Sequence, residues 1–117
     1  MEEKTFIKLP DSELEVMQGI WALYAEGETF ISAGMIMKRF PALNRLKLTT
    51  VLTLITRLQI KGFISTEKNG RTNCYTPLIV WEEYRKFAMN DFIERVFLGD
   101  KEAFAAAVLE VNGSQNN

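Results

Sequence analysis

One stretch of the sequence, residues 48–76, limits the possible folds more than any other. Its first part, 48–61, has apolar residues spaced i, i+3, i+4 and i+7, which predicts an amphipathic helix closed by a glycine. Two short segments, 63–67 and 71–76, follow and read as strands, joined at Asn69-Gly70, the strongest two-residue hairpin signal. A core-facing helix followed at once by a hairpin is therefore expected. The core-facing positions are Val51, Leu54, Ile55 and Leu58.

Two more helices are expected ahead of this stretch. Ser12 and Glu15 have the spacing of a capping box, just after a proline, so a first helix should begin there and end at Gly27. A second, short helix should begin after Ser32 and stop at Pro41, because the residue before a proline is pushed away from helical dihedrals. The apolar stripe of the first helix should consist of Leu14, Met17, Ile20, Trp21 and Tyr24.

Three helices followed by a hairpin with a basic tip describe a winged helix-turn-helix, a mostly α fold with a small β-wing (α+β). In such a fold the third helix enters the major groove of DNA and the wing touches the neighbouring backbone. We therefore expect residues 1–77 to form a DNA-binding domain and residues 78–112 a helical dimerisation region. Residues 113–117 should form a polar, disordered tail.

The distribution of charge supports this architecture better than the total charge does. The chain of 117 residues has a net charge of −1, but residues 38–75 contain eight basic side chains and one acidic side chain, a net of +7. The segments on either side are acidic, with −5 over residues 1–37 and −3 over residues 76–117. A local basic block can contact phosphates and release counterions. An ordinary solvated surface is the alternative explanation.

The exposed face of the helix over 48–61 is short, neutral and free of carboxylates, which suits insertion into a groove lined by phosphates. An ordinary solvent face would normally include aspartate or glutamate, and none occurs between residues 29 and 66. The residues on this face are Thr49, Leu52, Thr53, Thr56 and Gln59, and we expect the first four to face bases. The side chains expected near phosphates, at the start and flank of the helix and at the wing tip, are Lys47, Arg57, Lys61, Lys68, Asn69 and Arg71.

Two further helices are expected after the hairpin, from about Trp81 to Leu98 and from Lys101 to Val111, separated by Gly99-Asp100. They follow a complete winged domain, so little remains within one subunit to cover their apolar faces. We expect these faces to join two subunits; packing back on the first helix is the alternative. The expected interface residues are Trp81, Tyr84, Phe87, Phe92, Val96, Phe104 and Val108.

The residue types present exclude several kinds of catalytic and metal site. The sequence has no histidine and one cysteine, Cys74, so it can form no Ser-His-Asp triad, no Cys-His pair and no CxxC site. We expect no enzyme activity, no cofactor and no metal. No apolar run approaches the ~20 residues that span a bilayer. The first residues also lack the layout of a signal peptide, so the cytoplasm is the expected compartment and no membrane association is expected.

Two motifs resemble the penicillinase repressor family (BlaI/MecI/CopY type). Residues 50–58, Thr-Val-Leu-Thr-Leu-Ile-Thr-Arg-Leu, continue through Lys-Gly-Phe-Ile at 61–64 in a run similar to that of the family. Residues 13–21 are similar to the family's opening helix, with its pattern E-x-x-V-M-x-x-x-W. The Phe-Leu-Gly-Asp break at 97–100 also matches, and the resemblance extends over about residues 9–110.

The resemblance implies a homodimer that binds a pseudo-palindromic operator in double-stranded DNA and represses the genes behind it. It places Thr49, Thr50 and Thr53 at the DNA, and it places Arg57 and Lys61 near phosphates or in a role bracing the helix. Members of the family answer a membrane sensor protease that responds to β-lactams, and a copper-responsive branch uses a C-terminal cysteine pair. A sensor protease or a small-molecule inducer is therefore an expected partner.

The sequence departs from the family pattern at four places. Lys47 stands where the family usually has a serine-type helix cap, and Leu52 replaces a basic or polar residue, which indicates a different base preference. No cysteine follows Cys74, so the copper-binding pair is absent. Ala107-Val108 stands where some members have the asparagine–phenylalanine bond that is cleaved on induction.

Two other functions are compatible with the same pattern. The winged helix could be a protein-interaction module, in which case the basic face of residues 38–75 would meet an acidic partner. The chain could also be a regulator that responds to a small hydrophobic ligand bound between the winged domain and the helix that starts near Trp81. Binding to duplex DNA would separate the first of these from a repressor.

Overall fold

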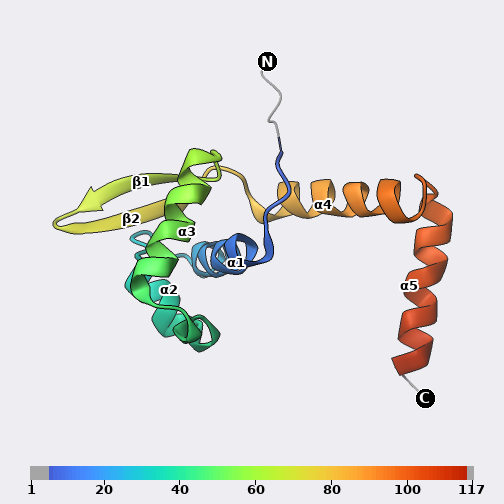
Figure 1. Ribbon diagram of the computed structural model, residues 1–117, viewed down its shortest axis with the longest axis horizontal. Helices are drawn as coiled ribbons and strands as arrows, with labels where there is room; N and C mark the ends of the chain where they lie inside the picture. Colours follow the sequence, from blue (N-terminus) through green and yellow to red (C-terminus); the bar gives the residue numbers. More distant parts are fainter. Residues whose placement is uncertain (1–5, 116–117) are drawn as a thin grey trace. The chain divides into compact units, whose positions relative to one another are not determined.

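The computed structural model describes the backbone of residues 6–115, and its side chains up to residue 113. The chain divides into two compact units, one up to Trp81 and one from Glu82 onward. The first unit contains helices α1 (Asp11–Ala25), α2 (Ala33–Arg39) and α3 (Leu48–Ile60), a short 3₁₀ helix, and a hairpin of strands β1 (Ile64–Asn69) and β2 (Thr72–Pro77). The second is built from helices α4 (Trp81–Val96) and α5 (Lys101–Gln115). Figure 1 shows these elements in chain order. The predicted fold class, a mostly α winged helix with a small β-wing, is confirmed.

Helix α1 (Asp11–Ala25) lies at the centre of the first unit and packs against α2, α3 and β2. Because it is covered on several sides, it buries a wider face than the predicted stripe, and Val16 and Leu23 join the core. Tyr24, predicted to be buried, lies in the last turn and is exposed. The indole Nε1 of Trp21 donates a hydrogen bond to the carbonyl of Ile79 at 2.8 Å, which ties α1 to the segment after the hairpin.

The predicted capping box at the start of α1 is wrong. The helix begins at Asp11, one residue before Ser12, and no side chain accepts a hydrogen bond from its first turn. Glu15 does not fold back onto the backbone, because its carboxylate binds the guanidinium of Arg45 at 2.6 Å. The carbonyl of Pro10 accepts the first hydrogen bond of the helix, from the N–H of Leu14 at 2.9 Å, so the proline is the N-cap.

Helix α2 (Ala33–Arg39) begins as predicted, with the Ser32 hydroxyl accepting a hydrogen bond from the backbone N–H of Met35 at 3.2 Å. The 3₁₀ helix (Pro41–Arg45) follows at the proline that ends it. Helices α1 and α2 approach each other closely at Gly19, where a Cβ atom would lie 2.9 Å from Cγ2 of the buried Ile36. Only a residue without a side chain fits this crossing.

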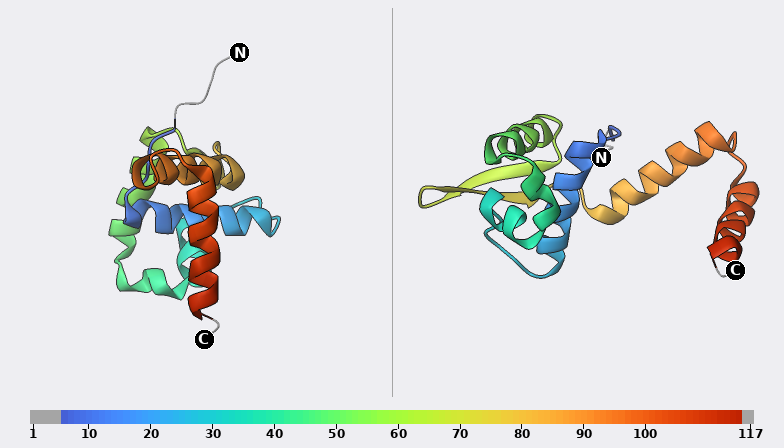
Figure 2. Two further views of the ribbon diagram at one scale, coloured as in Figure 1. Left: turned by 90° about the vertical axis from the view of Figure 1, so that its right-hand side faces the viewer. Right: turned by 60° about the horizontal axis from the view of Figure 1, so that its bottom comes forward.

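Helix α3 (Leu48–Ile60) matches its predicted bounds to within one residue. All four residues predicted to face the core, spaced i, i+3, i+4 and i+7, are buried. The two further views in Figure 2 show α3 beside the hairpin and α2 within the same unit. The core that α3 shares with α1 therefore fixes which face of α3 is left outside.

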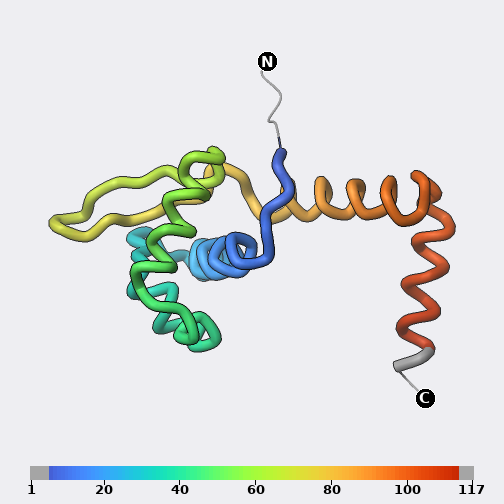
Figure 3. Tube along the Cα trace, in the orientation of Figure 1, coloured from blue at the N-terminus to red at the C-terminus, as the bar shows by residue number. Residues whose placement is uncertain are grey.

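The wing consists of two antiparallel strands, β1 (Ile64–Asn69) and β2 (Thr72–Pro77), and Figure 3 shows it extending beyond the helices of its unit. Asn69 pairs with Thr72, so the two loop residues are Gly70 and Arg71, one position later than predicted. Gly70 has φ +68°, and a glycine at the first loop position is what a type II′ turn requires. The turn thus needs positive φ only at a glycine, and Asn69 stays in the ladder.

The second unit departs from prediction at both helix ends. Helix α4 (Trp81–Val96) stops two residues early, because Leu98 and Gly99 both adopt positive φ, 52° and 83°. Helix α5 (Lys101–Gln115) begins after Asp100, whose carboxylate accepts a hydrogen bond from the N–H of Ala103 at 3.0 Å. It runs four residues past its predicted end, so residues 113–115, predicted as tail, are helical because the i→i−4 ladder continues through them. Residues 116–117 lie outside the described part of the chain.

Three aromatic rings hold the corner between α4 and α5. The ring centroids of Phe92, Phe97 and Phe104 lie 5.6 to 6.1 Å apart, in tilted or edge-to-face pairs. Such pairs contribute about 0.5–1.5 kcal/mol each beyond their buried area. Phe92 and Phe104, both predicted as interface residues, therefore also stabilise the second unit from within.

The close crossing of α1 and α2 predicts a specific sensitivity. The substitution Gly19→Ala should lower the free energy of unfolding by about 1–3 kcal/mol, because the new methyl group overlaps buried Ile36 and must displace it. Gly34→Ala is the matched control: its Cβ would meet only the Ser32 hydroxyl at 3.9 Å, and helix propensity should make it neutral or stabilising by up to about 1 kcal/mol. Urea unfolding followed by circular dichroism measures both. A Gly19→Ala variant as stable as the parent would contradict the packing described.

Candidate nucleic-acid interface

The outer face of α3 carries the residues predicted to read bases. Thr49, Leu52, Thr53 and Thr56 are exposed and lie at i, i+3, i+4 and i+7 on one side of the helix. They lie opposite the four residues that α3 buries. Thr50, which the family resemblance adds to this set, is exposed as well. We call the surface of Thr49, Leu52, Thr53 and Thr56 the reading face.

Two hydroxyl groups on the reading face point back to the helix itself. Thr53 Oγ1 donates to the carbonyl of Thr49 and Thr56 Oγ1 donates to the carbonyl of Leu52, each at 3.0 Å. This i−4 pattern is common for threonine in helices. The bond uses the single proton of each hydroxyl group. The lone pairs of the hydroxyl oxygens remain available as acceptors, and the threonine methyl groups remain available for apolar contacts.

The reading helix is tied to the wing by a pair that sequence reasoning did not anticipate. Gln59, near the end of α3, accepts a hydrogen bond from the hydroxyl of Thr66 on β1 at 3.0 Å. Both side chains are polar and partly or fully exposed. Only the alternation along the strand could have shown that Thr66 turns toward the helix. The contact sets the wing beside the C-terminal end of α3.

Ion pairs divide the eight basic side chains of residues 38–75 into two groups. Three of them bind carboxylates that belong to the acidic N-terminal segment, at N–O distances of 2.5 to 2.7 Å. These pairs are Arg39–Glu26, Arg45–Glu15 and Lys61–Glu13. The acidic flank therefore neutralises part of the basic block inside the first unit.

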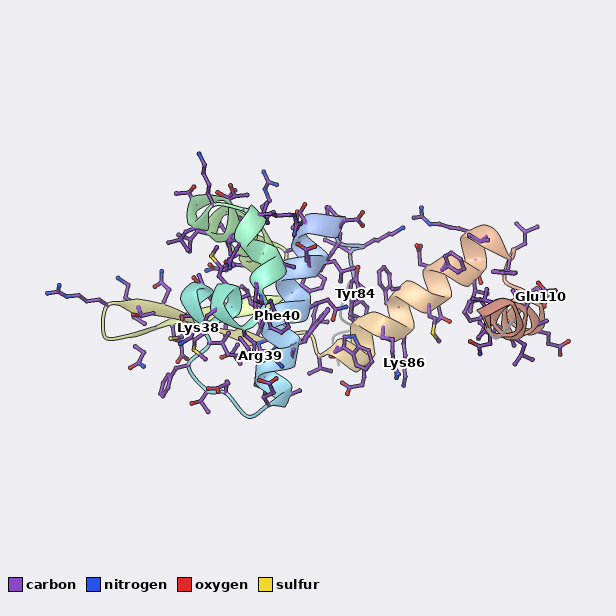
Figure 4. The ribbon with its side chains drawn as sticks, turned by 90° about the horizontal axis from the view of Figure 1, so that it is seen from below. Lys38, Arg39, Phe40, Tyr84, Lys86 and Glu110 are labelled. Carbon is purple, nitrogen blue, oxygen red and sulfur yellow. The ribbon has the colours of Figure 1, made fainter. Side chains whose placement is uncertain are left out.

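The other five cations form no ion pair with any residue between 6 and 113. Lys47 precedes the first turn of α3, Arg57 lies on its outer side, and Lys68 and Arg71 flank the wing tip. Lys38, which the predicted set omitted, completes the group at the end of α2 and is labelled in Figure 4. These residues, Lys38, Lys47, Arg57, Lys68 and Arg71, are the free cations.

The profile of the penicillinase repressor family matches residues 9–116. The chain belongs to the penicillinase repressor family. The penicillinase repressor of Bacillus licheniformis is 28% identical over 107 residues, which cover 92% of this chain and 80% of that protein. The methicillin resistance regulatory protein MecI of Staphylococcus aureus (strain N315) and that of Mammaliicoccus sciuri are each 30% identical over 99 residues, covering 85% of this chain and 76% of the relative.

In this penicillinase-repressor family member, Lys61 pairs with Glu13, the one charged side chain that is buried among residues 6–113, and this favours the bracing role over phosphate contact. Glu13 is 3% exposed, and its carboxylate meets the Lys61 ammonium at 2.5 Å, where the lysine side chain is 25% exposed. Glu13 lies in the first turn of α1 and Lys61 caps the C-terminus of α3, so each charge also matches the dipole of its own helix.

The base of the wing is apolar and uncharged. The backbone N–H of Tyr75 donates to the carbonyl of Ile31 at 2.8 Å, which adds a short third segment beside the hairpin. Burial, and after it the neighbouring Cys74, raises the pKa of the Tyr75 phenol above its ordinary value, so the group stays protonated at neutral pH. Cys74 itself is buried, as expected of a structural thiol.

The residues expected at a subunit interface differ in exposure. Tyr84, on α4 in Figure 4, is buried within the chain and stacks on Phe87 with ring centroids 5.8 Å apart, so it has little surface to offer a partner. Phe87 and Phe104 are half-buried. The exposed members of the predicted set are Trp81, Phe92, Val96 and Val108. Exposed apolar side chains of the same helices that the set omitted are Met89, Leu109 and Val111.

Nowhere among residues 6–113 do three histidine, cysteine, aspartate or glutamate side chains gather as a metal site would need. Of the helices described between 6 and 115, none is long and apolar enough to cross a bilayer.

The Glu13–Lys61 pair predicts a large difference between two neighbouring glutamates. Glu13→Gln should lower the free energy of unfolding by about 2–4 kcal/mol, because it removes a buried charge partner of Lys61. Glu15→Gln is the matched control, since the Glu15–Arg45 pair is exposed and such pairs contribute about 0–1 kcal/mol. Chemical denaturation of both variants measures the difference. Equal losses would show that burial of Glu13 does not matter.

Proposed function

We propose that the protein is a transcriptional repressor that binds an operator in double-stranded DNA as a homodimer. The observation that carries this proposal is the segregation of charge in the first unit. The free cations lie at the start and on the exposed side of α3, at the wing tip and at the end of α2, while the paired cations are matched by carboxylates. A protein that binds a polyanion by its grooves needs this arrangement, because phosphates flank each groove on both sides.

Docking follows from the winged-helix geometry. Helix α3 enters the major groove with the reading face toward base edges, and the wing lies along the adjacent backbone with Lys68 and Arg71 near phosphates. Lys47 and Arg57 meet phosphates on the two sides of the groove. We assign DNA binding to residues 1–77 and dimerisation to residues 78–112.

Dimerisation is supported by exposed apolar surface on α4 and α5. Val96, Val108, Leu109 and Val111 are all exposed in the single chain. A second copy is the partner that fits an operator with pseudo-two-fold symmetry, since a twofold dimer presents two reading helices to two equivalent half-sites. The relatives are named as a repressor and as regulatory proteins, which supports a regulatory rather than a catalytic role.

Release from DNA would require a signal that acts on the dimer. The bond aligned with the family's cleavage site, Ala107-Val108, lies inside α5, so its backbone must unfold locally before a protease can cut it. Proteolysis within residues 99–111, or a hydrophobic inducer that prefers the form unable to bind DNA, would each lower operator affinity. With no cysteine after Cys74, a copper-binding pair is absent from the sequence, and copper should not release the complex.

The segregation of cations predicts how salt affects binding. Each neutralised phosphate contributes about −0.9 to the slope of log K against log salt concentration. Lys68→Ala removes a free cation and should make the slope shallower by about 1 per subunit, with similar losses on operator and random DNA. Arg39→Ala is the control, because Arg39 is already paired with Glu26. The salt slope of this variant should equal that of the parent protein. Fluorescence anisotropy over a salt series measures both; a flat response of the parent protein would contradict DNA binding.

The apolar faces predict the oligomeric state. Val108→Asp places a charge on the exposed apolar side of α5, so the protein should become monomeric at micromolar concentration and lose most operator affinity through lost bivalency. Ala103→Asp is the matched control, since it adds the same charge at an exposed position of the same helix that has none of Val108, Leu109 and Val111 three or four residues away, and it should leave the dimer intact. Sedimentation equilibrium distinguishes them. A parent protein that sediments as a monomer would overturn the dimer.

A further inference from the structure

We infer that the reading face selects its operator through the 5-methyl group of thymine, and that Leu52 is the residue that recognises it. The inference rests on the proposed function and specifies the kind of base pair that this DNA-binding surface prefers. Its basis is the chemistry that the reading face exposes between the free cations.

The centre of the reading face offers methyl groups but no free hydrogen-bond donor. Leu52 is 38% exposed and has no polar side-chain atom. Its neighbours Thr53 and Thr56 have already used their hydroxyl protons on backbone carbonyls, at 3.0 Å each. The groups that remain at the surface are aliphatic carbons and hydroxyl oxygens with acceptor lone pairs.

The four base pairs differ in how well they match such a surface. Guanine presents two acceptors, N7 and O6, in the major groove, and these need donors that Leu52, Thr53 and Thr56 cannot supply. Thymine presents a methyl group, and adenine presents an amino group that can donate to a threonine oxygen. A thymine–adenine pair therefore satisfies both the leucine and a neighbouring hydroxyl oxygen, whereas a guanine facing Leu52 would leave its acceptors desolvated without partners.

Charge on the same helix identifies duplex DNA as the occupant of this apolar surface. Lys47 and Arg57 stand five residues before and after Leu52, about 7.5 Å along the axis in each direction. Neither cation has an ion-pair partner among residues 6–113. In duplex DNA a base edge lies between two phosphate backbones, and this matches an apolar centre between two unpaired cations. If the partner were instead an apolar protein surface, neither cation would meet an opposite charge.

The experiment removes the methyl group from DNA without altering base pairing. Operator duplexes are first selected from a random pool with the full-length protein, and each thymine of both half-sites is then replaced by deoxyuridine, one symmetric pair of positions at a time. At one position the affinity should fall about fourfold per half-site, and about fifteenfold for both, because one buried methyl group is lost from each contact. Deoxyuridine at the other positions should change affinity by less than about twofold.

Protein variants then assign the effect to Leu52. Leu52→Ala should bind the thymine operator as weakly as the parent binds the deoxyuridine operator, and it should no longer distinguish the two DNAs. Ile60→Ala is the matched control: Ile60 is a 79% exposed aliphatic residue of the same helix, but it lies two turns away at the end that leaves the groove. This variant should keep the full difference between thymine and deoxyuridine.

Two results would overturn the inference while leaving the repressor function intact. One is specific operator binding that no deoxyuridine replacement weakens. The other is a Leu52→Ala variant that still distinguishes thymine from deoxyuridine to the same extent as the parent. A parent protein that selects no sequence from the pool and shows no salt-dependent binding would contradict the proposed function itself, so the two failures are distinguishable.

Discussion

The buried ion pair between Glu13 and Lys61 acts with the apolar core to set the orientation of α3. A carboxylate as deeply buried as Glu13 needs a cation beside it, since its burial without a partner would cost several kcal/mol. The pair joins the first turn of α1 to the C-terminal cap of α3. Together with the buried apolar residues of α3, it fixes the rotation of the helix about its axis. The reading face is the side that this rotation leaves outside.

The same carboxylates explain how a chain with a net charge of −1 can present a basic surface. Three glutamates, Glu13, Glu15 and Glu26, bind cations that the fold brings next to α1. The cations of the α3 start and the wing tip form no ion pair with residues 6–113, and no carboxylate occurs between residues 29 and 66. Total charge is therefore a poor guide to the partner of such a protein, and the pairing pattern is a better one.

Periodicity predicted α3 well, because this helix buries one side of a regular spacing, but it predicted the buried face of α1 less well, because α1 is covered on several sides. The bounds of α3, its four core positions and the serine cap of α2 all follow from local patterns. The Glu13–Lys61 pair could not be predicted, since its members are 48 residues apart and either could have been a solvated charge. The hairpin register was missed by one residue, because a glycine can serve at either loop position. The break at Gly99-Asp100 and the start of α5 were predicted correctly, but the end of α4 was placed two residues too late, since Leu98 adopts a positive φ that its residue type disfavours.

A reading face with few free donors has a consequence for how specificity arises. Methyl contacts with base edges discriminate more weakly than the bidentate contacts of arginine or glutamine, so a single half-site distinguishes its sequence by a small factor. Most of the affinity of one subunit then comes from phosphate contacts, which are the same on every DNA. In the proposed repressor, two half-sites bound by one dimer would multiply these small factors, because both must match before the full affinity is reached. The proposal thus gives the apolar surface of α4 and α5 and the threonine-rich face of α3 complementary roles: a weakly discriminating surface would become specific when a second copy is held at a fixed distance.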